Sequence, residues 1–137
     1  VTRAVYDANG DAKRVAEDIR ARVFAKTSCA CSVGVGSNRL VARLATKVAK
    51  PDGSRVVEPG RGERRFVAET SLADVPGLGR KAMEKLKALE ARVGAKLERC
   101  EDVVEKVSAK ALNEALGASI ELSRICIFDC MHFLEGP

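Results

Sequence analysis

Two strand patterns and one amphipathic helix follow one another within residues 28–58, separated by glycines and a proline. Ser28–Val35 is rich in Ser, Cys and Val, which predicts a buried strand. The helix that follows has a candidate cap at Asn38, and it must end before Pro51 because a residue that precedes proline avoids the helical region. Arg55–Glu58 predicts a second short strand, so this part of the chain packs two strands and a helix into one unit.

Helices are predicted on both sides of this run. Asp11–Lys26 carries apolar residues at helical spacing and begins with Asp, a residue type that caps helices. A polar, basic connection, Gly60–Arg65, is followed by helical patterns at Ser71–Asp74, Arg80–Leu89, Glu101–Val107, Ala109–Leu116 and Ser119–Leu134. Ala91–Arg99 fits either a loop or a helical extension. We therefore predict an α+β, helix-dominated chain, with a helix-strand-helix-strand subdomain at residues 1–65 and an all-helical subdomain at 66–137.

Positive charge is concentrated in two zones of the sequence. Residues 1–65 contain 14 Lys and Arg against 7 Asp and Glu, and residues 80–99 contain 7 against 3. Residues 100–137 reverse the balance, with 3 basic and 7 acidic residues. The two basic zones are either solvated helix faces or a surface that binds phosphates, and the charge alone leaves both interpretations open.

Composition excludes several classes of protein. No run of about 18 apolar residues occurs, so no segment is expected to span a membrane. An odd number of cysteines without a leader segment predicts free thiols in an intracellular compartment, the nucleus in a eukaryote and otherwise the cytoplasm. These cysteines are Cys29, Cys31, Cys100, Cys126 and Cys130. Because the first residue is Val1 rather than Met, we expect the chain to be cut from a longer one.

Two glycine motifs are candidates for binding phosphate. Gly34–Asn38 lies between a strand and a helix, but Arg39 stands where a dinucleotide-binding loop needs its third glycine, and no P-loop sequence occurs. The hairpin Val75–Lys81 is a stronger candidate, because two glycines let backbone amides turn outward and the next helix points its N-terminal amides the same way. This is the helix-hairpin-helix pattern, which holds a duplex backbone without reading bases.

Basic side chains on the helix before Pro51 are the other candidates. Arg39, Arg43 and Lys47 form a stripe that is a candidate DNA-facing surface, and Lys50 at the forced helix end suits contact with a phosphate. No strand-borne pair of carboxylates is present for two-metal chemistry, so no metal ligands are predicted. The residues alone therefore indicate a segment that binds nucleic-acid backbone and has no visible catalytic centre.

Two of these motifs also resemble a known family. The run Cys31–Gly53 closely resembles the palm of Y-family translesion DNA polymerases of the UmuC and DinB type, and Val75–Lys81 is similar to the family's thumb motif. The first run is most similar to the deoxycytidyl-transferase branch. The resemblance implies a partial palm at residues 1–65 and, at 66–137, a small all-helical thumb with a helix-hairpin-helix motif.

The resemblance further implies roles for particular residues. Lys50 would contact the triphosphate of the incoming deoxynucleoside triphosphate, and Gly77, Gly79, Arg80 and Lys81 would hold the backbone of primer-template DNA. The family's metal carboxylates lie in an early Asp motif and a Ser-x-Asp-Glu motif, and neither is present here. We therefore expect no catalytic or metal-binding residue in this chain, Mg²⁺ in the parent polymerase, and no activity from the fragment alone. The parent would extend primers past DNA damage and be recruited by a sliding clamp or other polymerases.

Two other functions stay open from the sequence. A non-enzymatic helix-hairpin-helix module that binds DNA would explain the hairpin and the charge, but not the run Cys31–Gly53. A Ser-x-Asp-Glu motif directly before Val1 would favour the polymerase over this module. A protein-interaction domain would instead use the acidic end around Glu101–Glu105, and it predicts no salt-dependent binding of duplex DNA.

Overall fold

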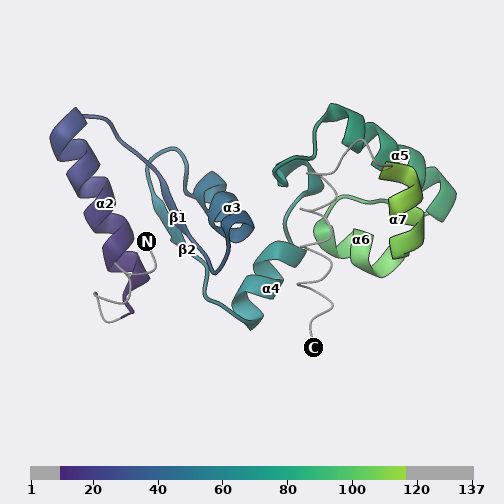
Figure 1. Cartoon of the computed structure of the whole chain (residues 1–137), viewed down its shortest axis with the longest axis horizontal. Coiled ribbons are helices and arrows are strands. Elements are labelled where there is room, and N and C mark those ends of the chain that lie inside the picture. The colour runs from purple at the N-terminus through teal and green to yellow at the C-terminus, as the bar shows by residue number, and fades with distance from the viewer. Residues whose placement is uncertain (1–9, 117–137) are drawn as a thin grey trace. The chain divides into compact units, whose positions relative to one another are not determined.

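The computed structural model describes residues 10–116 (Figure 1). Its elements are α2 (Ala12–Thr27), β1 (Val33–Val35), α3 (Arg39–Ala49), β2 (Ser54–Val56), α4 (Arg61–Ala68), the 3-10 helix η1 (Leu72–Asp74), α5 (Arg80–Val93), α6 (Cys100–Lys106) and α7 (Ala109–Leu116). This order confirms the predicted helix-dominated α+β class. The chain forms two compact units, which join in sequence between Glu63 and Arg64. The predicted helix Ser119–Leu134, with Cys126, Cys130 and His132, lies outside the described residues.

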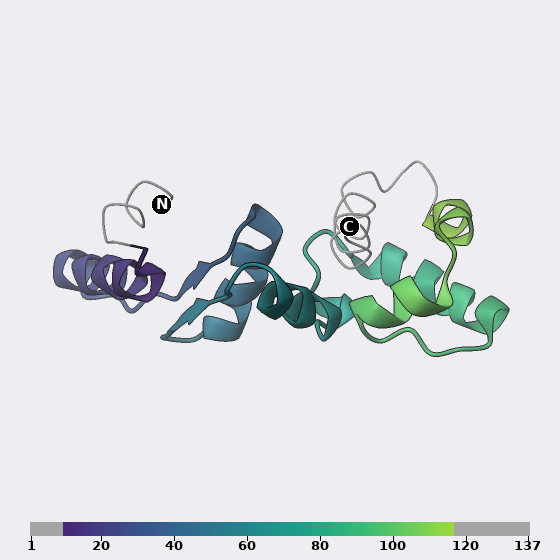
Figure 2. The ribbon, with the colours of Figure 1, turned by 90° about the horizontal axis from the view of Figure 1, so that it is seen from below.

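The first unit is built on a parallel pair of strands. β1 and β2 pair in the register Val33 to Ser54 and Val35 to Val56, and both strands contact α2 and α3. Figure 2 shows α2 on one side of the strand pair and α3 on the other. A side chain at Gly34 would place its Cβ 2.2 Å from the backbone nitrogen of Thr46, so the glycine allows α3 to lie directly against β1.

Side chains and a proline set the ends of the first helices, as predicted. The Asp11 carboxylate accepts the amide hydrogen of Arg14 at 2.9 Å and caps α2. Asn38 does the same for α3, since its side-chain oxygen accepts from the amide of Val41 at 3.0 Å. The backbone of Lys50 is extended before Pro51, with φ −68° and ψ 148°, which ends α3.

Two predictions about the strands were wrong in extent. The strand expected at Ser28–Val35 is limited to Val33–Val35, and its residues are half-buried rather than buried. Cys29 and Cys31 precede it, and the carbonyl of Cys31 accepts a hydrogen bond from an arginine side chain instead of a strand partner. The second strand begins one residue earlier than expected and ends at Val56.

The connection expected at Gly60–Arg65 is also wrong, because a helix begins there. Gly60 has φ +87°, a conformation that glycine adopts without strain, and α4 starts at the next residue. Glu63 and Val67 lie one helical turn apart and are both 1% exposed, so α4 has a buried stripe. The stripe was missed because one of its two members is charged.

The second unit has an apolar core in which leucine predominates. Its buried leucines are Leu72, Leu78, Leu86, Leu89, Leu97 and Leu112. α5 runs beyond the predicted Leu89 to Val93 and ends at Gly94, which has φ +71°. The segment after it returns alongside η1, where the amide of Leu72 donates to the carbonyl of Glu98 at 2.9 Å. No helix within residues 10–116 has the length and apolar character needed to cross a membrane.

Candidate nucleic-acid interface

The basic stripe predicted on α3 lies on the surface of the first unit. Arg39, Arg43 and Lys47 are all exposed. Successive members lie four residues apart and so share one side of the helix, whereas the buried residues of α3 are Val41, Leu44 and Ala45. The stripe therefore offers positive charge to solvent on the side of α3 that does not pack on the strands.

Lys50 continues this surface at the end of α3. Its side chain is exposed, and its backbone amide donates to the carbonyl of Lys47 at 3.4 Å. The chain then bends through Pro51 and Asp52, and β2 begins at Ser54. Lys50 thus stands at the junction between a helix and a short turn.

A hydrogen-bonded network from α2 holds this turn. The guanidinium of Arg20 donates to Asp52 Oδ1 at 2.5 Å, to Glu17 Oε2 at 2.6 Å and to the Cys31 carbonyl at 3.0 Å. The hydroxyl of Ser54 donates to the other oxygen of Glu17 at 2.5 Å. The network joins α2, the segment before β1 and both sides of the turn.

The same contacts shift the pKa values of the two central groups. Hydrogen bonds from Ser54 and then from Arg20 lower the pKa of Glu17. Bonds to Asp52 and then to Glu17 raise the pKa of Arg20. Both groups are therefore charged at neutral pH, and each stabilises the charged form of the other. Sequence spacing reveals only the pair between Glu17 and Arg20, because Asp52 is 32 residues away from the arginine.

The hairpin in the second unit is anchored by two buried side chains. Val75 and Leu78 are 3% and 8% exposed, and the amide of Leu78 donates to the carbonyl of Val75 at 3.2 Å. Gly77 has φ +91°, which favours glycine. The amide of Gly79 donates to the carbonyl of Gly77 at 3.1 Å, so it is used inside the turn rather than directed outward as predicted.

Gly79 leaves the start of α5 open. It is the N-cap residue, it has no side chain to bond the first-turn amides, and its φ of −77° is accessible to any residue. A Cβ built at this position meets no atom within 4 Å, so packing does not require a glycine either. Arg80 and Lys81 are exposed beside it, with Arg80 Nε 4.0 Å from Glu84 Oε1. The amides at the start of α5 and two cations are thus accessible to an anion.

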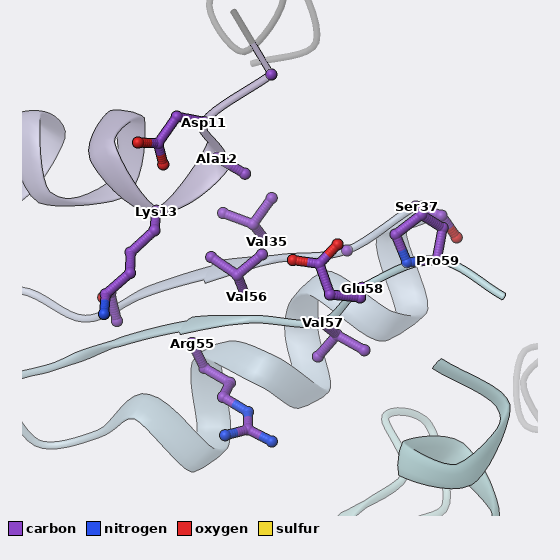
Figure 3. Close-up of a pocket in the computed structure, with 13 residues that line it drawn as sticks. Asp11, Ala12, Lys13, Val35, Ser37, Arg55, Val56, Val57, Glu58 and Pro59 are labelled. Carbon is purple, nitrogen blue, oxygen red and sulfur yellow. The ribbon is translucent and has the colours of Figure 1, made fainter. Parts of the chain in front are cut away.

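A cavity of about 670 Å³ in the first unit was not predicted from the sequence. It lies between the start of α2 and the strands, with Val35 and Val56 in its wall (Figure 3). Its charged lining residues are of both signs, Asp11 and Glu58 against Lys13 and Arg55. The cavity therefore has no net preference for a phosphate, in contrast to the stripe and the hairpin.

Metal binding finds no support among the described residues. Within residues 10–116 there is no group of three or more His, Cys, Asp and Glu side chains that could hold a metal ion. Cys29, Cys31 and Cys100 form no disulfide with one another, and Cys100 is buried. The predicted site residues lie in two separate groups. The stripe and Lys50 belong to the first unit, and the hairpin belongs to the second unit.

Comparison with protein families and curated proteins finds a DNA repair protein and several DNA polymerases. Residues 1–47 match the impB/mucB/samB family (IMS). The chain is 35% identical over 123 residues to the DNA repair protein Rev1 of Drosophila melanogaster, which is 85% of this chain and 12% of that protein. It is 40% identical over 90 residues to DNA polymerase IV of Gluconobacter oxydans, which is 66% of this chain and 25% of that protein.

A solved structure has the same fold. The insertion ternary complex of Dbh DNA polymerase matches 96% of this chain with a TM-score of 0.72 and 19% sequence identity. The match covers 35% of the Dbh chain. The chain therefore spans about a third of this structure, and 12% and 25% of the two curated proteins.

Proposed function

Because this chain is related in sequence and in fold to the Y-family DNA polymerases, we propose that it is a part of such an enzyme that holds the incoming nucleotide and the primer-template duplex. Residues 1–65 would form the later part of the palm and residues 66–137 the thumb with its helix-hairpin-helix motif. The polymerase would transfer deoxynucleotides to primers opposite damaged templates. The observation that carries the proposal is that both phosphate-binding candidates of a polymerase-related chain are exposed, on well-anchored backbone.

In the first unit, Lys50 would bind the triphosphate of the incoming nucleotide. An ammonium at a fixed helix end acts as a compact point charge for phosphate oxygens. It lowers the repulsion between the triphosphate and the DNA backbone. The stripe Arg39, Arg43 and Lys47 would add positive potential along the same helix and attract the nucleic acid.

In the second unit, the hairpin would hold one backbone phosphate of the duplex. The amides at the start of α5 donate to the phosphate oxygens, and Arg80 and Lys81 add charge. Gly79 is the specific support for this role, because neither its φ nor its packing requires glycine. A bare position next to helix amides permits the close approach of a phosphate, which a side chain would block.

The metal chemistry of such an enzyme is assigned to other parts of the protein. We propose Mg²⁺ as its metal, and the described residues do not fit a metal site. Recruitment of the polymerase by a sliding clamp or by other polymerases is part of the proposal, as is an intracellular location.

Two changes at the hairpin test the proposal through binding of a short DNA duplex to the 137-residue chain. Arg80→Glu with Lys81→Glu is expected to weaken binding about tenfold or more and to reduce the slope of log affinity against log salt by about two, one for each cation removed. Lys87→Glu with Arg92→Glu is the matched control, since both residues are exposed on α5 and the charge change is the same.

Gly79→Ser separates binding from folding. Serine is a better N-cap than glycine, so the melting temperature is expected to stay equal or to rise. Its hydroxyl would occupy the first-turn amides and stand where the phosphate lies, so duplex affinity is expected to fall severalfold. Unchanged duplex binding in both this variant and the charge-reversed variant would refute the hairpin assignment.

A further inference from the structure

We propose that Arg20 is a positioning residue for Lys50, which it fixes by clamping the turn that follows α3. The inference rests on the proposed binding of triphosphate by Lys50, and it assigns a part in that binding to a residue on another helix. Arg20 does not contact the phosphates itself. It sets the direction in which the lysine leaves the surface.

The clamp begins with the geometry of the guanidinium. Its three nitrogens donate to three different segments: to Glu17 on the same helix, to Cys31 before β1 and to Asp52 in the turn. The Arg20 side chain is only 22% exposed, so it is held among these partners rather than moving freely in solvent. A planar guanidinium can make such divergent bonds at fixed angles, and a lysine cannot.

The turn is held from its other side as well. The hydroxyl of Ser32 donates to the carbonyl of Pro51 at 2.9 Å, directly after Lys50. Ser54, where β2 begins, is bonded to Glu17, which Arg20 also binds. Residues 51, 52 and 54 are therefore each tied to the segment before β1 or to α2. Because Lys50 is joined to this turn on one side and to α3 on the other, its backbone has little freedom.

A simple structural role would predict something different. An arginine that only stabilised the fold would change the melting temperature and leave a correctly folded Lys50 as effective as before. A positioning residue instead changes the affinity of Lys50 for phosphate even when the chain is folded. Its effect must also disappear when Lys50 is absent, and a double-mutant cycle measures this directly.

In the test, the 137-residue chain is titrated with dCTP, and binding is monitored through the NMR signals of the lysine side chains and backbone amides. Lys50→Ala is expected to weaken dCTP binding about tenfold, as for loss of one charge-assisted contact. Arg20→Ala is expected to weaken it about threefold, and Arg20→Lys to give an intermediate value. In the Lys50→Ala background, Arg20→Ala should have no further effect.

Arg22→Ala is the matched control. Arg22 lies on the same helix, its side chain is 80% exposed, and its guanidinium lies 3.8 Å from the exposed carboxylate of Asp18. Its loss should leave dCTP affinity unchanged. If Arg20→Ala lowers the folded population, Asp52→Ala removes the clamp from the turn side and should reproduce the threefold effect.

The outcomes distinguish the two proposals. If Lys50→Ala leaves dCTP affinity unchanged, the triphosphate role of Lys50 is wrong, and the inference falls with it. If Lys50→Ala weakens binding but Arg20→Ala and Asp52→Ala do not, the proposed function stands and the positioning role is wrong. An effect of Arg20→Ala that persists in the Lys50→Ala background would also overturn positioning, because Arg20 would then act on the nucleotide without Lys50.

Discussion

The two units of the molecule are held together by different kinds of contact. The first unit buries valines, alanines and a leucine, together with the carboxylate of Glu63, and its strand residues are half-buried apart from the exposed Arg55. Hydrogen-bonded side chains link its distant segments, as in the network around Arg20. The second unit buries leucines throughout, with Leu72, Leu86 and Leu89 each 1% exposed.

This difference in stabilising contacts determines how strongly the geometry of each candidate site depends on the packing of its unit. In the second unit, the core is separate from the exposed residues of the hairpin, so Gly79 and Arg80 can change without loss of packing. In the first unit, the turn after Lys50 is part of the network that joins the segments. We therefore expect substitutions at the two sites to differ in their effects. At the hairpin they should change binding and leave the packing unchanged. At the turn after Lys50 they should change binding and local structure together.

The largest expected effect is loss of the leucine core. Leu86→Ala removes a fully buried side chain of α5 and is expected to destabilise the second unit by about 2–5 kcal/mol. Urea unfolding followed by amide NMR signals of each unit measures it, with Lys87→Ala, an exposed neighbour, as the control. An equal loss of stability in the first unit would contradict the view that separate contacts stabilise the two units.

A smaller effect is expected at the buried carboxylate of the first unit. Glu63 accepts from the amide of Ser37 at 3.2 Å and from its hydroxyl at 2.5 Å. Glu63→Ala leaves both donors without this partner and is expected to cost about 1–3 kcal/mol, measured by urea unfolding. Glu63→Gln keeps an acceptor oxygen and should cost less. If both variants unfold with the same free energy as the native chain, this polar contact does not stabilise the first unit.

The smallest effect concerns acid stability of the second unit. The hydrogen bond from Lys106 and then that from the amide of Arg99 lower the pKa of Asp102 to about 2. Because the folded pKa lies below the unfolded value, this contribution is complete above about pH 4 and is lost as the pH falls towards about 2.

Asp102→Asn isolates the acid effect from that of other carboxylates. It should be less stable than the native chain at neutral pH, by about 1 kcal/mol because Lys106 is partly exposed and screened. The difference between the two proteins should shrink as the pH falls from about 4 to about 2. Chemical unfolding at several pH values measures it, and a difference that does not change with pH would exclude Asp102 as the titrating group.

Local signals in the sequence predicted most of the fold. Asp11, Asn38 and Pro51 act through bonds or clashes with residues three or fewer positions away, so they mark helix ends in any context. Prediction failed where a long-range contact matters. The α4 helix was missed because its buried residue Glu63 is bonded to Ser37, 26 residues away, and no local pattern reveals that contact. Of the candidate site, Lys50 and the hairpin could be named from motifs, but the network around Arg20 needed the structure.

The most direct test of the account is a map of both ligands on one chain. Amide NMR signals of the 137-residue protein are recorded during titration with a short DNA duplex and, separately, with dCTP. We predict that the duplex shifts the signals of residues 77–81 in a salt-dependent way, and that dCTP shifts those of residues 47–54. Duplex-induced shifts confined to the acidic segment 101–105, or no shifts with either ligand, would contradict the assignment of this chain to the nucleotide and duplex contacts of a polymerase.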